Sequence, residues 1–160
     1  MSKGFTLIEL LVATGLFVMV TGLAAGVFVN SLRSQQAVVA LMAANDNASL
    51  ALEQMSREIR TGYQFSTNSQ KTELQFLDQK LGKVTYRFNE DDGVIERNGL
   101  PLTSRNVKIS YLFFDLLGAL ANDGQSTRVT IRLAVSAIDQ RAKDIVTRLQ
   151  TTVSSRQLDI

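Results

Sequence analysis

The sequence predicts an α+β protein in which one long N-terminal helix packs, by its second half, on a mostly antiparallel β-sheet head. Two observations lead to this fold class. Residues Leu10 to Val29 form an apolar run of 20 residues without a charge. From Lys71 onward, apolar residues recur at every second position, which is the period of half-buried strands. The length of 160 residues suits one modest domain, or a smaller domain with an extended element.

Composition narrows the classes of function. The chain has 17 Lys and Arg against 15 Asp and Glu, a net charge of +2, and no basic block, which argues against a nucleic-acid partner. It contains no Cys and no His, so disulfides, thiol nucleophiles, Cys/His zinc sites and histidine general bases are excluded. We therefore expect no enzyme activity, no cofactor and no metal site.

The apolar run Leu10 to Val29 is long enough to cross a membrane. A helix rises about 1.5 Å per residue, so the run spans roughly 30 Å, the thickness of a bilayer's hydrocarbon core. Two alternatives are a signal peptide cleaved near Ala24-Ala25-Gly26 and a buried helix of a soluble core, but the run exceeds the usual length of a signal core, about 7–15 residues. Lys3 precedes the run and Arg33 follows it; the positive-inside rule favours a cytoplasmic N-terminus, with the head outside.

The helical period continues beyond the apolar run and predicts one helix from about Phe5 to Thr61. Its apolar stripe consists of residues at three- and four-residue steps: Val38, Leu41 or Met42, Ala48, Leu52, Met55 and Ile59. Such a helix is about 85 Å long, so the remaining residues cannot cover all of it. Asn45-Asp46-Asn47 has low helix propensity and indicates a weak point, and Gly62 fits a C-cap.

Alternating apolar residues and turn signals predict the strands of the head. The expected strands are Glu73–Asp78, Lys83–Phe88, Val94–Arg97, Val107–Asp115, Thr127–Ile138 and Ile145–Val153. Asn89–Gly93 contains the Asp-Gly pair typical of hairpins, Asn122–Gly124 predicts another turn, and Gln140–Asp144 predicts a polar loop. In the fourth strand, simple alternation places Val107, Ile109, Tyr111 and Phe113 on the buried face.

The N-terminal string GFTLIELLVA resembles the class III signal of type IV prepilins and pseudopilins. The resemblance implies that a prepilin peptidase cleaves after Gly4 and methylates the new N-terminal residue, Phe5. It also implies that Glu9, the fifth mature residue, guides subunits into a filament, and that Lys3 supplies the positive charge of the leader. The motif is specific because it requires these residue types in a fixed order before a spanning helix.

Glu9 has a second interpretation. Thr6-x-x-Glu9 fits a capping box, and an acid near a helix N-terminus is favoured by the helix dipole. A cap alone explains neither Gly4-Phe5 nor an acid at the entrance to a membrane, where ionisable residues usually have a partner. The amine of Phe5 in a neighbouring subunit is a natural partner for Glu9.

Looser patterns indicate a subtype. ALEQMSREIR (51–60), the hairpin VTYRFNEDDGVIERNG (84–99), LTSRNVKISYLFFD and TRVTIRLAV resemble J-type pseudopilins of type II secretion and W-type minor pilins. Many major pilins have a disulfide loop and a helix proline; this chain has no cysteine and has Gly26 where that proline is expected. The resemblance implies a leader (1–4), a transmembrane assembly helix (5–30), an extramembrane helix half (31–62) and a β-rich head (63–160).

The resemblance implies a structural subunit near the tip of a type II secretion pseudopilus or a type IV pilus, in protein secretion or pilus biogenesis. The expected location is the inner membrane, with a single pass. The implied partners are the prepilin peptidase, other minor pilins or pseudopilins, the major subunit, the inner-membrane assembly platform and the lipid bilayer. A single-pass envelope protein that binds a ligand without polymerising, and an anchored enzyme, are the alternatives.

Three weaker features have an ordinary explanation beside the functional one. Gly22-x-x-x-Gly26 could form a close-packing helix face, although glycine is common in membrane helices. Glu90-Asp91-Asp92 could bind Ca²⁺, but three acids in a hairpin turn do not make a cage. Asn47-Ala48-Ser49 matches a glycosylation sequon on a predicted helix, and we attribute this match to chance.

Overall fold

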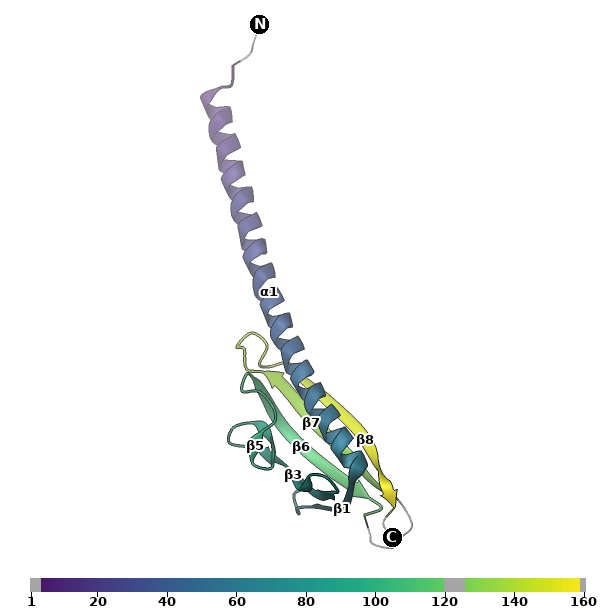
Figure 1. Cartoon of the computed structure of the whole chain (residues 1–160). Helices are drawn as coiled ribbons and strands as arrows, with labels where there is room; N and C mark the ends of the chain where they lie inside the picture. The colour runs from purple at the N-terminus through teal and green to yellow at the C-terminus, as the bar shows by residue number, and fades with distance from the viewer. Residues whose placement is uncertain (1–3, 120–125, 159–160) are drawn as a thin grey trace. The chain divides into compact units, whose positions relative to one another are not determined.

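The computed structural model describes residues 4–119 and 126–158, in which one helix, α1 (Leu7–Thr61), precedes eight strands (Figure 1). The strands are β1 (Gly62–Thr67), β2 (Glu73–Asp78), β3 (Gly82–Asn89), β4 (Val94–Arg97), β5 (Leu100–Pro101), β6 (Val107–Leu117), β7 (Ser126–Ala137) and β8 (Val146–Leu158). The predicted α+β class with a long N-terminal helix is confirmed. The chain divides into two compact units, Met1–Val38 and Val39–Ile160, and α1 contributes to both.

The described part of the first unit consists of Gly4–Thr6 and the first part of α1. Its apolar side chains are exposed, and a window of 18 residues within α1 is long and apolar enough to cross a membrane. The hydroxyl of Thr14 donates to the backbone oxygen of Leu10 at 2.9 Å, so this polar group is satisfied inside the helix. The segment therefore exposes almost only apolar surface, which is the requirement for contact with lipid.

The second unit contains two antiparallel sheets where the sequence predicted one. The first sheet has the order β1-β2-β3-β4-β5 and the second the order β6-β7-β8. The free edge of β6 joins them: the backbone N–H of Ile109 donates to Gly93 O, and that of Phe114 donates to Lys71 O, both at 2.8 Å. Gly93 lies in the turn that the Asp-Gly pair predicted, and its φ is 62°. The backbone carbonyl of Gly93 is the group that accepts the bond from β6.

The second half of α1 packs on the sheets through a narrow stripe of mostly small residues. These buried residues are Ala44, Ala48, Ala51, Met55 and Ile59. Of the predicted stripe, Ala48, Met55 and Ile59 are buried on the sheets, Leu41 and Leu52 are half-buried, and Val38 and Met42 are exposed. The alanines determine the buried side because they let the helix backbone approach the sheets closely.

Two local signals in the sequence were outweighed by tertiary contacts. Asn45-Asp46-Asn47 does not interrupt α1, and the side-chain oxygen of Asn47 accepts a bond from the Ser104 backbone at 3.0 Å. Gly62 was expected to cap the helix, but it begins β1 directly and is not among the glycines with positive φ. The strand β1 was not predicted, because GYQFST shows little alternation.

A bulge corrects the predicted buried face of β6. The register between β6 and β7 shifts between Ile109 and Tyr111, so one extra residue lies in β6. A β-bulge of this kind changes which side chains point inward beyond it. The buried residues are therefore Val107, Ile109, Leu112 and Phe114, whereas Tyr111 and Phe113 face the other side.

A fragment that begins at Ser34 is expected to be soluble and folded without detergent. It retains every buried residue of α1 and all eight strands, and it lacks most of the exposed apolar side chains of the helix. Size-exclusion chromatography and circular dichroism check this expectation. Aggregation of the fragment would show that residues 34–61 of the helix need partners to cover their exposed face.

Gly62→Ala is expected to destabilise this fragment by about 1–3 kcal/mol, the usual cost of overpacking. A Cβ at Gly62 would lie 2.5 Å from Cδ2 of Phe76, which is only 1% exposed and has little room to move. Urea unfolding measures the change. The same substitution in a Phe76→Leu background should cost less, and an equal cost in both backgrounds would contradict the steric explanation.

Candidate assembly site

The residues of the signal-like motif lie before α1 and in its first turn. Gly4 and Phe5 are exposed and not helical, and Phe5 as a whole residue is 89% exposed. A Cβ built on Gly4 would meet no atom within 4 Å. The peptide bond between Gly4 and Phe5 is thus in an accessible stretch of the kind that a protease requires. Lys3, the expected leader charge, lies outside the described residues.

Glu9 forms the capping box that its spacing from Thr6 predicts. Its Oε2 accepts hydrogen bonds from the Thr6 backbone N–H at 2.9 Å and the Thr6 hydroxyl at 3.0 Å. In return, the Glu9 backbone N–H donates to Thr6 Oγ1 at 3.3 Å. Within residues 4–119 and 126–158, Thr6 is the one side-chain partner of Glu9, and Oε1 accepts no bond.

The surroundings of Glu9 are apolar and open. A shallow hollow of about 320 Å³ beside it is lined by Ile8, Glu9, Val12, Ala13 and Leu16. The described residues place no Lys or Arg beside it, because the first basic residue along α1 is Arg33. A carboxylate on such a surface needs a cation or a donor from elsewhere once water is removed.

Three glycines of α1 in the first unit have empty space beside them. A Cβ at Gly15, Gly22 or Gly26 would have no atom within 4 Å, so nothing in the described chain occupies these positions. Gly22 and Gly26 are four residues apart and lie on one side of the helix, as the predicted close-packing face requires. The space is available to another helix or to lipid.

In the second unit, a polar network fastens α1 to the five-stranded sheet. Glu58 of α1 accepts bonds from Arg97 Nε at 3.1 and 3.0 Å and from the hydroxyl of Tyr86 at 2.9 Å. Gln54 donates to the same carboxylate at 3.2 Å. Burial, followed by the adjacent Glu58 carboxylate, raises the pKa of Tyr86, and the hydrogen bond to Glu58 raises the pKa of Arg97.

A second polar contact secures the C-terminal end of α1. The hydroxyl of Thr61 donates to Asp78 Oδ2 at 2.7 Å, and the backbone N–H groups of Lys80 and Leu81 donate to Oδ1 at 2.8 and 2.9 Å. These bonds, the one from Thr61 first, lower the pKa of Asp78. Neither this contact nor the Glu58 network was predicted from the sequence.

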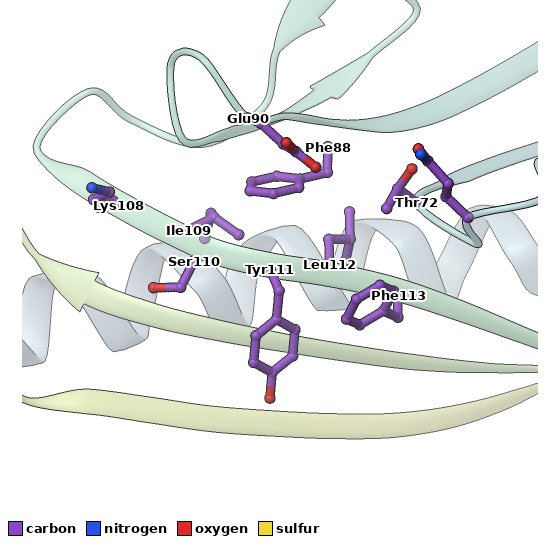
Figure 2. Close-up of a pocket in the computed structure, with 10 residues that line it drawn as sticks. Thr72, Phe88, Glu90, Lys108, Ile109, Ser110, Tyr111, Leu112 and Phe113 are labelled. Carbon is purple, nitrogen blue, oxygen red and sulfur yellow. The ribbon is translucent and has the colours of Figure 1, made fainter.

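A cleft of the described head lies between the sheets, along β6 (Figure 2). It has a volume of about 640 Å³ and is lined by Gln70, Thr72, Phe88, Glu90, Lys108, Ile109, Ser110, Tyr111, Leu112 and Phe113. Phe88, Ile109 and Leu112 form its apolar floor. Glu90 and Lys108 are its charged residues, and they do not form an ion pair in the part of the chain that the structure describes.

The acidic turn of the β3–β4 hairpin is organised around an asparagine. The Asn89 side-chain oxygen accepts the backbone N–H groups of Asp91 and Asp92, and its amide donates to Asp92 Oδ2 at 3.2 Å. Among the described residues, no group of three or more Asp and Glu side chains is placed to hold a metal ion. The turn geometry thus follows from hydrogen bonds within the hairpin.

No family model, curated protein or solved structure matches the chain.

Proposed function

We propose that the chain is a minor pilin or pseudopilin, a structural subunit of a type II secretion pseudopilus or a type IV pilus. A prepilin peptidase cleaves it after Gly4 and methylates Phe5. The mature helix anchors the subunit in the inner membrane and then packs among other subunits of the filament, for protein secretion or pilus biogenesis. Its partners are the peptidase, the major subunit, other minor subunits and the assembly platform.

The observation that carries the proposal is the exposed apolar segment of α1 with one carboxylate in its first turn. The window that could cross a membrane has none of its residues buried within the chain. Apolar surface of this extent requires cover by lipid or by other helices, since it costs roughly 25 cal/mol per Å² in water. Glu9 adds a group that lipid cannot satisfy and a neighbouring amine can.

The capping-box geometry favours a second candidate, a single-pass anchored envelope protein that does not polymerise. Because Thr6 already satisfies Glu9 Oε2, the acid has a local role without any partner subunit. In that case the motif is a helix start, and the head is presented from the membrane by a permanent anchor.

Intact-mass analysis separates these candidates. The chain is expressed with an N-terminus as encoded, in a host that contains a prepilin peptidase and in the same host without it. The proposal expects loss of residues 1–4 and one methyl group on Phe5, only where the peptidase is present. An unprocessed chain in both hosts would refute the prepilin assignment and leave the permanent anchor.

Gly4→Leu is expected to abolish this processing. The peptidase must bring the scissile backbone close to its catalytic groups, and glycine is the residue with no side chain in the way. The mass of the purified chain, compared with wild type from the same host, measures the outcome. The variant should still fractionate with membranes, because Leu10–Val29 is unchanged. Normal maturation of Gly4→Leu would contradict the assignment of the cleavage site.

A further inference from the structure

The outward face of the three-stranded sheet β6-β7-β8 combines basic and aromatic side chains. The register places residues in rows across the three strands: Lys108 beside Ser136 and Val146; Tyr111 beside Ala134 and Arg148; Phe113 beside Arg132 and Gln150; Asp115 beside Thr130 and Thr152; Leu117 beside Arg128 and Ser154. The alternate residues of these strands, among them Leu112, Ile131 and Leu133, are buried on the other face.

This face carries an excess of positive charge. Its rows contain four basic residues, Lys108, Arg128, Arg132 and Arg148, all exposed, and one acid, Asp115. Asp115 is already shared between Lys71 Nζ at 2.9 Å and Arg132 at 2.6 Å. Within the described ranges, Lys108, Arg128 and Arg148 form no ion pair. These three cations are available to an external anion.

Two aromatic rings lie among the cations. The centroids of Tyr111 and Phe113 are 5.5 Å apart, with 28° between the ring planes. The guanidinium of Arg132 lies 6.0 Å from the ring centroid of Phe113, a residue that is 36% exposed. Figure 2 shows Tyr111 pointing away from Phe88 of the cleft, so this ring belongs to the sheet face. The bulge in β6 is what directs both rings outward.

We propose that this face binds single-stranded nucleic acid. Exposed cations track a phosphate backbone, and aromatic rings beside Arg offer stacking surfaces for bases, which is how sheet proteins bind single strands. The rings favour a nucleic acid over an acidic polypeptide, because carboxylates gain nothing from them. Gln150, which is exposed beside Arg132, adds an amide donor for phosphate oxygens.

The chain-wide composition could not indicate this face. The expectation against a nucleic-acid partner rested on a net charge of +2 and on the lack of a basic block. The four cations span 40 positions of the sequence, from Lys108 to Arg148, and only strand pairing brings them onto one surface. The binding proposed here does not depend on filament assembly.

The test uses the full chain in a neutral detergent and a fluorescein-labelled oligothymidylate of about 16 nucleotides, the upper range of a single-strand site. Fluorescence anisotropy gives the dissociation constant between about 50 and 200 mM salt. With the three unpaired cations engaged, log K should fall against log salt with a slope of about −2, which is a roughly 20-fold loss over this range. No measurable binding at about 50 mM salt would overturn the proposal.

Two variants separate the contribution of the cations to binding from that of the aromatic rings. Arg128→Gln/Arg148→Gln should weaken binding roughly 10-fold and reduce the slope by about 1.4, because two phosphate contacts are lost. Phe113→Leu should weaken binding roughly 5-fold with the slope unchanged, because stacking is lost and charge is not. The matched control Lys80→Gln/Lys83→Gln removes two exposed cations of the β2–β3 hairpin and should bind as wild type.

Two outcomes would contradict the proposal that this face binds single-stranded nucleic acid. An equal loss in the Lys80→Gln/Lys83→Gln control would mean that binding follows total charge, and the face would have no role. If a polyglutamate peptide with the same number of charges displaced the oligonucleotide at equal concentration, the partner would be an acidic polypeptide instead.

Discussion

Glu9→Gln is expected to reduce incorporation of the chain into a filament by roughly 100-fold or more, while membrane insertion and cleavage after Gly4 continue. Breaking one side of a buried ion pair costs about 3–5 kcal/mol, and about 1.4 kcal/mol corresponds to a tenfold change. Glutamine can still accept the bond from the Thr6 backbone, so this variant keeps the cap that the structure shows and loses only the charge.

Thr6→Ala is the complementary control. It removes the hydroxyl that bonds both the Glu9 carboxylate and the Glu9 backbone N–H, and it keeps the charge. If Glu9 acts in assembly, Thr6→Ala should incorporate nearly as wild type. Crosslinking to partner subunits, with the extent of cleavage measured in the same samples, gives both quantities. Normal crosslinking of Glu9→Gln beside impaired Thr6→Ala would show that Glu9 acts only as a cap.

Arg97→Met is expected to destabilise the fragment beginning at Ser34 by about 2 kcal/mol. Removing one partner of a fully buried pair costs about 3–5 kcal/mol, and we expect less here because the two side chains keep some exposure, 25% for Arg97 and 15% for Glu58. The substitution leaves the Glu58 carboxylate at the helix–sheet contact with Tyr86 and Gln54 as donors and without a cation.

The double variant Glu58→Gln/Arg97→Met tests the cause. It removes the charge together with its partner, so it should be more stable than Arg97→Met alone, and a double-mutant cycle by urea unfolding gives the coupling. Glu53→Gln/Arg57→Met is a matched control, because this pair is 3.9 Å apart and largely exposed. A control variant that loses as much stability as Arg97→Met would contradict the role of the Glu58 network.

The fold followed from sequence wherever a local period was long and regular. β2 and β4 have the predicted limits, and α1 begins two residues after its expected start. Predictions failed where a contact distant in sequence decides the structure. The bulge after Ile109 moves Tyr111 and Phe113 outward, and Gly62, which lies against the Phe76 ring, begins β1 directly instead of capping α1.

The candidate assembly site shows the same division. The roles of Gly4, Phe5 and Glu9 rest on a local motif and stay predictions, whereas the Thr6–Glu9 cap, which is also local, is confirmed. The links between Glu58 and Arg97 and between Thr61 and Asp78 join residues that are 39 and 17 positions apart, so spacing alone gives no sign of them.

The extra residue in β6 connects the interior of the head with its surface. Because the strand shifts by one position after Ile109, the same insertion brings Leu112 and Phe114 inside and turns Tyr111 and Phe113 to solvent. A strand has only two sides, so neither pair can change place without the other. Gain or loss of a single codon at this point would place the residues that now face solvent in the core, and the core residues on the surface. The outer surface and the packing beneath it must therefore evolve together.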